Sequence, residues 1–238
     1  MNKKIFFLAV LVIALGVDSC GPKKRPDEES KPLRVVNVPP FNADSAYFFV
    51  EKQVTFGPRV PNTKSHRQAS GYFVNQFKRF GAVVVEQNFD AITWDNQKLQ
   101  LKNIIASYNP QAQKRILLAA HWDTRPYADK DTEKRDAPFD GANDGASGVG
   151  VLLEVARAMG KSKLPDVGVD LILFDGEDWG EKDNERGKTN LPDDQSWWCL
   201  GSQYWAKHKH VKNYSAYYGI LLDMVGAKHA QFFREGQS

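Results

Sequence analysis

Three acidic residues follow a hydrophobic run in the stretch LILFDGEDWG, which spans residues 171–180. Its first four residues are typical of a buried strand, and Asp175, Glu177 and Asp178 come directly after them. Carboxylates that crowd together where a buried strand ends repel one another unless a positive charge lies among them. The spacing therefore predicts a metal-ion site at this end of the strand.

Three other segments carry similar side chains just after hydrophobic runs. The run ILLAA is followed by His121 and Asp123, the run GILL is followed by Asp223, and Asp144 lies in the glycine-rich loop GANDGASG. Open α/β sheets place their ligand sites beyond the ends of their strands, so we expect these segments to meet at one edge of a sheet. An imidazole together with carboxylate oxygens is a ligand set suited to zinc.

Each of these residues also has a simpler interpretation. Asp144 could cap the helix that follows it, and Asp123 and Asp175 could orient a ligand or hold a turn instead of binding an ion directly. We interpret His66 as a surface residue of a helix. The remaining histidines apart from His121 lie near lysines, and we expect them to be solvated: His208, His210 and His229.

Strands and helices must alternate to bring these segments together. Helical spacing of hydrophobic residues predicts helices over residues 62–81 and 147–160. β-branched and aromatic residues predict strands over residues 82–89, 98–108, 114–120, 167–174 and 215–222, and the later strands are hydrophobic enough to be buried on both faces. The expected fold class is α/β, with a mixed and mostly parallel central sheet sandwiched by helices.

The composition excludes a basic binding surface of the kind that nucleic acids need. The chain has 238 residues and a formal net charge of +3, so we expect no nucleic-acid partner. It has two cysteines, Cys20 and Cys199. If Cys20 is modified, no disulfide can form within the chain, and the fold must be stabilised by its hydrophobic core.

The first residues are typical of an exported protein. Two lysines precede a hydrophobic run that ends at Val17 and is shorter than the roughly 18 residues of a membrane-spanning helix. The following Cys20 resembles the modified cysteine of bacterial lipoproteins. We therefore expect a lipid anchor on Cys20 at the bacterial cell envelope and no other attachment to the membrane. The expected parts are a lipoprotein signal peptide (1–20), a disordered tether (21–34) and a single catalytic domain (35–238).

Five motifs together resemble the zinc-dependent aminopeptidase superfamily. HWD, GANDGASGVGVLLEVAR, DGEDWG, GSQYWA and LLDMVGA occur in its order and at about its spacing, and the resemblance covers residues 55–238. Within the superfamily the chain resembles the bacterial glutaminyl cyclases, because residues 181–200 replace the short turn that the aminopeptidases have there. This segment carries Trp197 and Trp198, and we expect them to form, with Trp179, the walls of a small substrate pocket.

The resemblance implies a glutaminyl-peptide cyclotransferase that acts on peptides or proteins with an N-terminal glutamine. It implies that Asp144 and Asp178 hold one zinc ion, that Glu177 is the general acid and base, and that Asp223 orients the substrate amine. The first alternative is a dizinc aminopeptidase, in which His121 and Asp223 hold a second ion. The second alternative is an extracellular binding module without activity. We expect a monomer in each case.

Asp123, next to His121, is expected either at this second ion or as a residue that orients its ligands. The resemblance also implies a third zinc ligand, a histidine much further along the chain than Asp223. No segment of that kind follows in this sequence, and His229 is not in the expected place. We therefore expect the catalytic domain to be incomplete at its C-terminus, so that this chain alone binds zinc weakly.

Overall fold

The computed structural model describes residues 38–162, 166–188, 191 and 196–232. The predicted signal peptide, the lipidation site at Cys20 and the predicted tether lie outside these residues. From Pro39 onward the described residues belong to one unit. None of the helices in the described ranges has the length and apolar character needed to cross a bilayer.

Four helices and five strands are formed by the described residues. In chain order they are α1 (Ala43–Val54), α2 (Lys64–Arg79), β1 (Val83–Ile92), β2 (Lys98–Tyr108), β3 (Arg115–His121), α3 (Ala146–Gly160), β4 (Gly168–Phe174), α4 (Leu200–Lys207) and β5 (Gly219–Leu221). The predicted helices correspond to α2 and α3, and the predicted strands to β1–β5. Helix α1 was not predicted, and β5 is shorter than the predicted strand. Tyr217, in the predicted strand but before β5, still bonds to β3, because its N–H donates to the Arg115 carbonyl at 2.8 Å.

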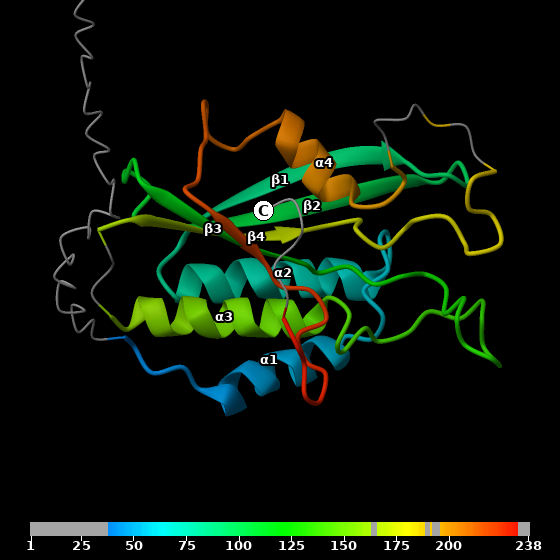
Figure 1. Ribbon diagram of the computed structural model, residues 1–238, viewed down its shortest axis with the longest axis horizontal. Coiled ribbons are helices and arrows are strands. Elements are labelled where there is room, and N and C mark those ends of the chain that lie inside the picture. Colours follow the sequence, from blue (N-terminus) through cyan, green and yellow to red (C-terminus); the bar gives the residue numbers. More distant parts are fainter. Residues whose placement is uncertain (1–37, 163–165, 189–190, 192–195, 233–238) are drawn as a thin grey trace, which may run out of the picture. The chain divides into compact units, whose positions relative to one another are not determined.

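The strands form one mixed sheet in the order β1-β2-β4-β3-β5, which confirms the predicted fold class. β2 pairs antiparallel with β1 and β4, whereas β3 pairs parallel with β4 and β5. Figure 1 shows α1, α2 and α3 on one side of the sheet and α4 on the other. β5 is the edge strand of this sheet, and its Ile220 and Leu221 are 46% and 65% exposed.

Alternation along β4 explains why this strand is hydrophobic on both faces apart from Asp170, which is paired with Arg115. Leu171 and Leu173 pack in the core cluster with α2 and α3, whereas Ile172 and Phe174 pack on the opposite face, where Trp205 of α4 covers them. All seven residues of β4 are buried. A strand covered by helices on both faces needs apolar side chains in both directions, so the two-layer covering follows from the sequence.

The register of the parallel pair brings the chemical motifs together. His121 at the end of β3 lies opposite Phe174 at the end of β4. The Trp122 N–H donates to the Phe174 carbonyl at 3.0 Å, so pairing continues past the last regular position. The segments that begin with His121 and with Asp175 therefore leave the sheet side by side, at the same edge.

Candidate metal centre and active site

His121, Asp144 and Asp223 form a group of potential metal ligands. They come from the end of β3, the loop before α3 and the residues after β5, and one ligand atom of each lies within 4.8 Å of the others. His121 Nε2 lies 2.9 Å from Asp144 Oδ1 and 3.6 Å from Asp223 Oδ1. The predicted convergence of separate segments at one edge of the sheet is therefore present in the structure.

Asp144 does not cap helix α3. The N-cap residue is Gly145, which has a φ of +81° and no side-chain capping bond. A Cβ atom at this position would lie 3.0 Å from His121 Cε1, so the glycine provides both the backbone conformation and the room for the imidazole. The capping interpretation was wrong, and the Asp144 carboxylate instead faces His121.

The His121 imidazole is surrounded by carboxylates. Burial disfavours its charged form, but the hydrogen bond with Asp144 and the nearby carboxylates of Asp123 and Asp223 outweigh this effect and raise the pKa of His121 well above its ordinary value. Its Nδ1 atom lies 3.5 Å from Asp123 Oδ1 and has no hydrogen-bond partner among the described residues. The site therefore attracts positive charge, whether on the imidazole or on a bound cation.

Asp123 holds the acidic loop through its backbone. Its carboxylate is fully buried and accepts the N–H groups of Glu177 at 3.0 Å and Asp178 at 3.1 Å. These bonds, together with His121, lower the pKa of Asp123 although burial raises it. Asp123 thus fixes the positions from which the next two acidic side chains start, which is the orienting role considered for it.

Asp178 is a buried carboxyl without a counter-charge close enough to pair with it. Burial and the charges of Asp123, Asp144 and Glu177 raise the pKa of Asp178 to about 8. Its Oδ2 atom has no hydrogen-bond partner among the described residues, and the nearest cation, Arg125 Nη1, lies 4.0 Å from Oδ1. Buried carboxyl oxygens are normally paired, so this atom is free to bind a ligand.

Glu177 points to a different set of neighbours. Its Oε2 atom lies 4.0 Å from His121 Nδ1, and its Oε1 accepts the Cys199 thiol at 3.2 Å. Burial raises the pKa of Glu177, and the charges of Asp123 and Asp223 raise it further. A carboxyl group that ionises closer to neutrality can both accept and donate a proton, which is the property of a general acid and base.

Together these donors fit a divalent cation. Five carboxylates and one imidazole lie at one edge of the sheet, the carboxylates repel one another, and a carboxylate oxygen and a ring nitrogen are left unpaired, as described above. Asp178 is not in the group of three around His121, but it lines a pocket of about 560 Å³ together with Asp144. Asp144 is therefore shared between the two arrangements that the sequence left open: Asp144 with Asp178, and Asp144 with His121 and Asp223.

The first acid of the opening stretch, Asp175, is not part of this site. It is fully buried and accepts His66 Nε2 at 2.9 Å and the Lys102 N–H at 2.7 Å. The interpretation of His66 as a surface residue was wrong, since it is 4% exposed and its ring stacks on Trp122. His66 precedes the buried Phe73 by seven residues, two helical turns, so helical spacing places it on the core face of α2.

His210 was also wrongly expected to be solvated. Its side chain is 3% exposed, and its Nδ1 accepts the Trp205 indole N–H at 3.0 Å because α4 turns back against the sheet there. His208 and His229 are exposed, as expected.

The three tryptophans lie in different surroundings. Trp179 is buried in a hydrophobic cluster and donates to Asp95 Oδ1 at 3.3 Å. Trp198 lines the pocket that contains Asp144 and Asp178, whereas Trp197 is partly buried beside it in the chain.

The Trp198 indole is held between two cations and a glycine. The Arg125 guanidinium lies 4.6 Å and that of Arg186 5.4 Å from its ring centre. A side chain at Gly180 would overlap this indole, so the absence of a Cβ makes room for it. The 181–200 segment therefore docks Trp198 at the pocket wall.

Sequence reasoning missed two residues that contact the acidic loop. Arg125 donates through Nη1 to the carbonyls of Asp178 at 3.1 Å and Gly180 at 3.2 Å, and Cys199 donates its thiol to Glu177. Arg125 lies two residues after the HWD motif, and a basic side chain so close to the predicted acidic site was a signal that could have indicated this contact. Cys199 is a free cysteine and its type gives no indication of this contact.

Comparisons with known proteins identify a family and several relatives. The model of peptidase family M28 matches residues 103–238. A glutaminyl-peptide cyclotransferase of Drosophila melanogaster is 27% identical over 184 residues, which cover 74% of this chain and 47% of that protein. The chain thus spans about half the length of this relative.

Two solved structures are more similar in sequence. The Bacteroides thetaiotaomicron glutaminyl cyclase bound to N-acetylhistamine is 50% identical, with a TM-score of 0.79 over 84% of this chain and 68% of that one. A Zn-dependent exopeptidase of Parabacteroides distasonis is 53% identical, with a TM-score of 0.78 over 84% of this chain and 67% of that one. With its family match extending over more than half of its residues, the chain belongs to peptidase family M28.

Proposed function

We propose that the protein is a zinc-dependent glutaminyl-peptide cyclotransferase, which converts the N-terminal glutamine of peptides or proteins to pyroglutamate and releases ammonia. Similarity to cyclases of known structure supports this activity. The observation that favours it over peptide hydrolysis is Trp198, which the 181–200 segment places in the pocket with Asp144 and Asp178. An indole wall suits the uncharged side chain of glutamine.

Asp144 and Asp178 would hold the zinc ion, because both face this pocket and Asp178 has an unpaired oxygen. Zinc bound there would supply Lewis acidity to the γ-carbonyl of the substrate glutamine. The substrate α-amine attacks the γ-carbonyl carbon, and Glu177 accepts the proton that the amine loses. Glu177 then donates this proton to the amide nitrogen, which leaves as ammonia when its bond to carbon breaks. Asp223 orients the amine for closure of the five-membered ring.

A second candidate function is supported by a separate observation. His121, Asp144 and Asp223 offer three ligand atoms within 4.8 Å, and this group would suit a second metal ion. Asp144 would contribute to both metal sites, and two metal ions would supply the Lewis acidity needed to hydrolyse an N-terminal residue. The similarity to Zn-dependent exopeptidases favours keeping this alternative.

One experiment separates the two functions. The purified protein, supplied with zinc, is incubated with a peptide that begins with glutamine and, separately, with one that begins with leucine, and the products are weighed by mass spectrometry. Loss of ammonia without shortening of the chain supports the cyclase, and removal of the first residue supports the peptidase. Glu177→Gln is the control, because it removes the proton carrier without removing a ligand. Retained cyclisation in this control would contradict the role of Glu177.

We also propose that the protein acts as a monomer at the bacterial cell envelope, held there by a lipid on Cys20. The sequence features that support this are the short hydrophobic run and the cysteine that follows it.

A further inference from the structure

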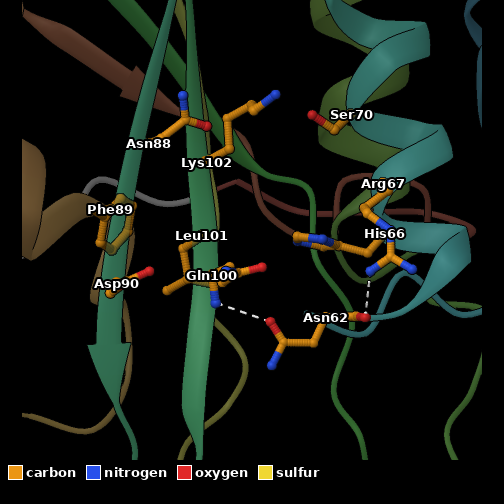
Figure 2. A pocket seen from close by; sticks show the side chains of 10 residues that line it. All are labelled: Asn62, His66, Arg67, Ser70, Asn88, Phe89, Asp90, Gln100, Leu101 and Lys102. Carbon is orange, nitrogen blue, oxygen red and sulfur yellow. Dashed lines mark hydrogen bonds between the residues drawn. The ribbon is translucent and has the colours of Figure 1, made fainter.

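A groove of about 650 Å³ lies between helix α2 and the strands β1 and β2 (Figure 2). None of the residues that line it belongs to the acidic cluster described above. The volume falls within the range of about 300–1,000 Å³ that is usual for small-molecule sites. The groove is therefore large enough to be a binding site in its own right.

Polar side chains from three elements line the groove. Arg67 and Ser70 come from α2, Asn88 comes from β1, and Gln100 and Lys102 come from β2. The side-chain amides of Asn88 and Gln100 have no hydrogen-bond partner in the described part of the chain. Beside the apolar Phe89 and Leu101, these side chains offer many hydrogen bonds to a polar ligand.

Ser70 is the most informative of these residues. It is 5% exposed, and its hydroxyl oxygen has no hydrogen-bond partner among the described residues. Figure 2 shows the hydroxyl directed from α2 toward the strands, into the groove. Buried hydroxyls are normally paired, so this one is a donor and acceptor whose partner is a ligand or solvent in the groove.

Two cations in the groove keep unused donors. Arg67 donates through Nη1 to the Asn62 carbonyl at 2.7 Å, and its other N–H groups remain for a ligand. Lys102 Nζ lies 2.7 Å from Glu86 Oε2, which uses one of its three N–H donors. The acid that lines the groove, Asp90, is paired with a cation outside the lining, Lys98, at 2.9 Å. Since Lys102 and Asp90 each have an ion-pair partner outside the lining, Arg67 supplies the charge that no carboxylate of the described residues balances, and this charge favours a negatively charged ligand.

We propose that this groove binds a carboxylate between the hydroxyl of Ser70 and the ammonium of Lys102, while the guanidinium of Arg67, which Figure 2 shows directed toward Asn62, supplies positive charge at that end of the groove. A carboxylate only accepts hydrogen bonds, and the hydroxyl and the ammonium both donate them. The amides of Asn88 and Gln100 bind the polar remainder of the ligand. The carboxylate comes either from a small free dicarboxylic acid or from an acidic side chain of a peptide, and these share the same chemistry.

The groove also lies next to the segment that follows strand β4. His66 lines the groove and its Nε2 atom is already bonded to Asp175, as is the backbone N–H of Lys102. His66 is therefore not a ligand-binding group in this proposal. It forms the floor that separates the groove from the segment leading to Glu177.

Calorimetric titration of the purified protein tests the proposal with two probes: glutarate, which chelates zinc weakly, and an acetylated and amidated tripeptide of glutamate. Ser70→Ala and Arg67→Gln should each weaken the binding of the probe by about tenfold or more, the effect of losing one hydrogen bond to a charged group or a nearby opposite charge. Ser70→Ala removes no internal hydrogen bond, so its fold should be intact, which thermal unfolding checks. Arg79→Gln, at the end of the same helix and outside the groove, is the matched control for lost charge and should bind normally.

Binding of glutarate with this pattern of variants supports a small dicarboxylate, and binding of the tripeptide alone with the same pattern supports an acidic peptide. The proposal is overturned if neither probe binds at millimolar concentration, or if the two groove variants bind as the wild type does.

Discussion

Replacing Asp178 by asparagine should stabilise the metal-free protein, and the gain should grow with pH. Asp178 is 6% exposed, and burial with the charges of Asp123, Asp144 and Glu177 raises its pKa from 3.8 to about 8. In the unfolded chain the same carboxyl ionises near its ordinary value. Between about pH 4 and pH 8 the folded state therefore binds more protons than the unfolded state, and the free energy of unfolding falls as the pH rises.

The pKa shift of Asp178 sets the size of this effect. One pKa unit corresponds to about 1.36 kcal/mol, so the carboxyl destabilises the folded protein by about 4 kcal/mol at pH 7 and about 2 kcal/mol at pH 5. Asparagine has a similar shape and no charge, and it should recover most of this energy. The difference in unfolding free energy between Asp178→Asn and the wild type should therefore roughly double from pH 5 to pH 7.

Urea unfolding in the presence of a metal chelator, followed by tryptophan fluorescence at several pH values, measures this difference. Asp183→Asn is a matched control, because Asp183 lines the same pocket but its side chain is 36% exposed. Its effect on the free energy of unfolding should be small, because its side chain remains partly in contact with water. A difference for Asp178→Asn that stays constant from pH 5 to pH 8, or a less stable variant at pH 7, would refute the reasoning.

Four other outcomes are expected. Glu177→Gln should lower cyclisation by about 10²- to 10⁴-fold with unchanged zinc content, since it removes a proton carrier, and full activity would exclude the role. Asp144→Asn should lose bound zinc, as measured by native mass spectrometry; an unchanged stoichiometry would mean that Asp144 is not a ligand. Because Asp178 must lose its proton to bind zinc, apparent zinc affinity should rise by about tenfold per pH unit up to about pH 8, and a flat titration profile would argue against this. Cys20→Ala should move the protein from the membrane fraction to the soluble fraction, and a variant that stays with the membrane would point to an uncleaved N-terminal helix.

The sheet could be predicted from the sequence because the residue composition of its strands is strongly hydrophobic. β4 is hydrophobic at nearly every position and buried at all seven, so its composition alone predicts a central strand. The ends of such strands locate a site in α/β folds, which is why His121, Asp144 and Asp223 could be grouped without coordinates. Helix α1 was missed because its exposed Tyr47 and Phe48 obscure the amphipathic pattern.

Hydrogen bonds between residues far apart in the chain could not be predicted from the sequence in this way. His66 and Asp175 are 109 positions apart, and only the packing of α2 on the sheet brings them together. As a result, the sequence left open whether Asp175 orients a ligand or holds a turn, and the structure shows that it stabilises the fold. The type of a residue predicts the chemistry that it can do, whereas its partner depends on tertiary packing.

The contact between Gly180 and Trp198 restricts which substitutions can accumulate at these two positions during evolution. A Cβ atom at position 180 would occupy the space of the indole, so no other residue fits at 180 while Trp198 is kept. A mutation to alanine at 180 would expel the ring from the pocket wall and release the two arginines that contact it. Homologues that carry the inserted segment and a tryptophan at 198 should therefore all have glycine at 180, whereas glycine at 180 can persist after the tryptophan is lost.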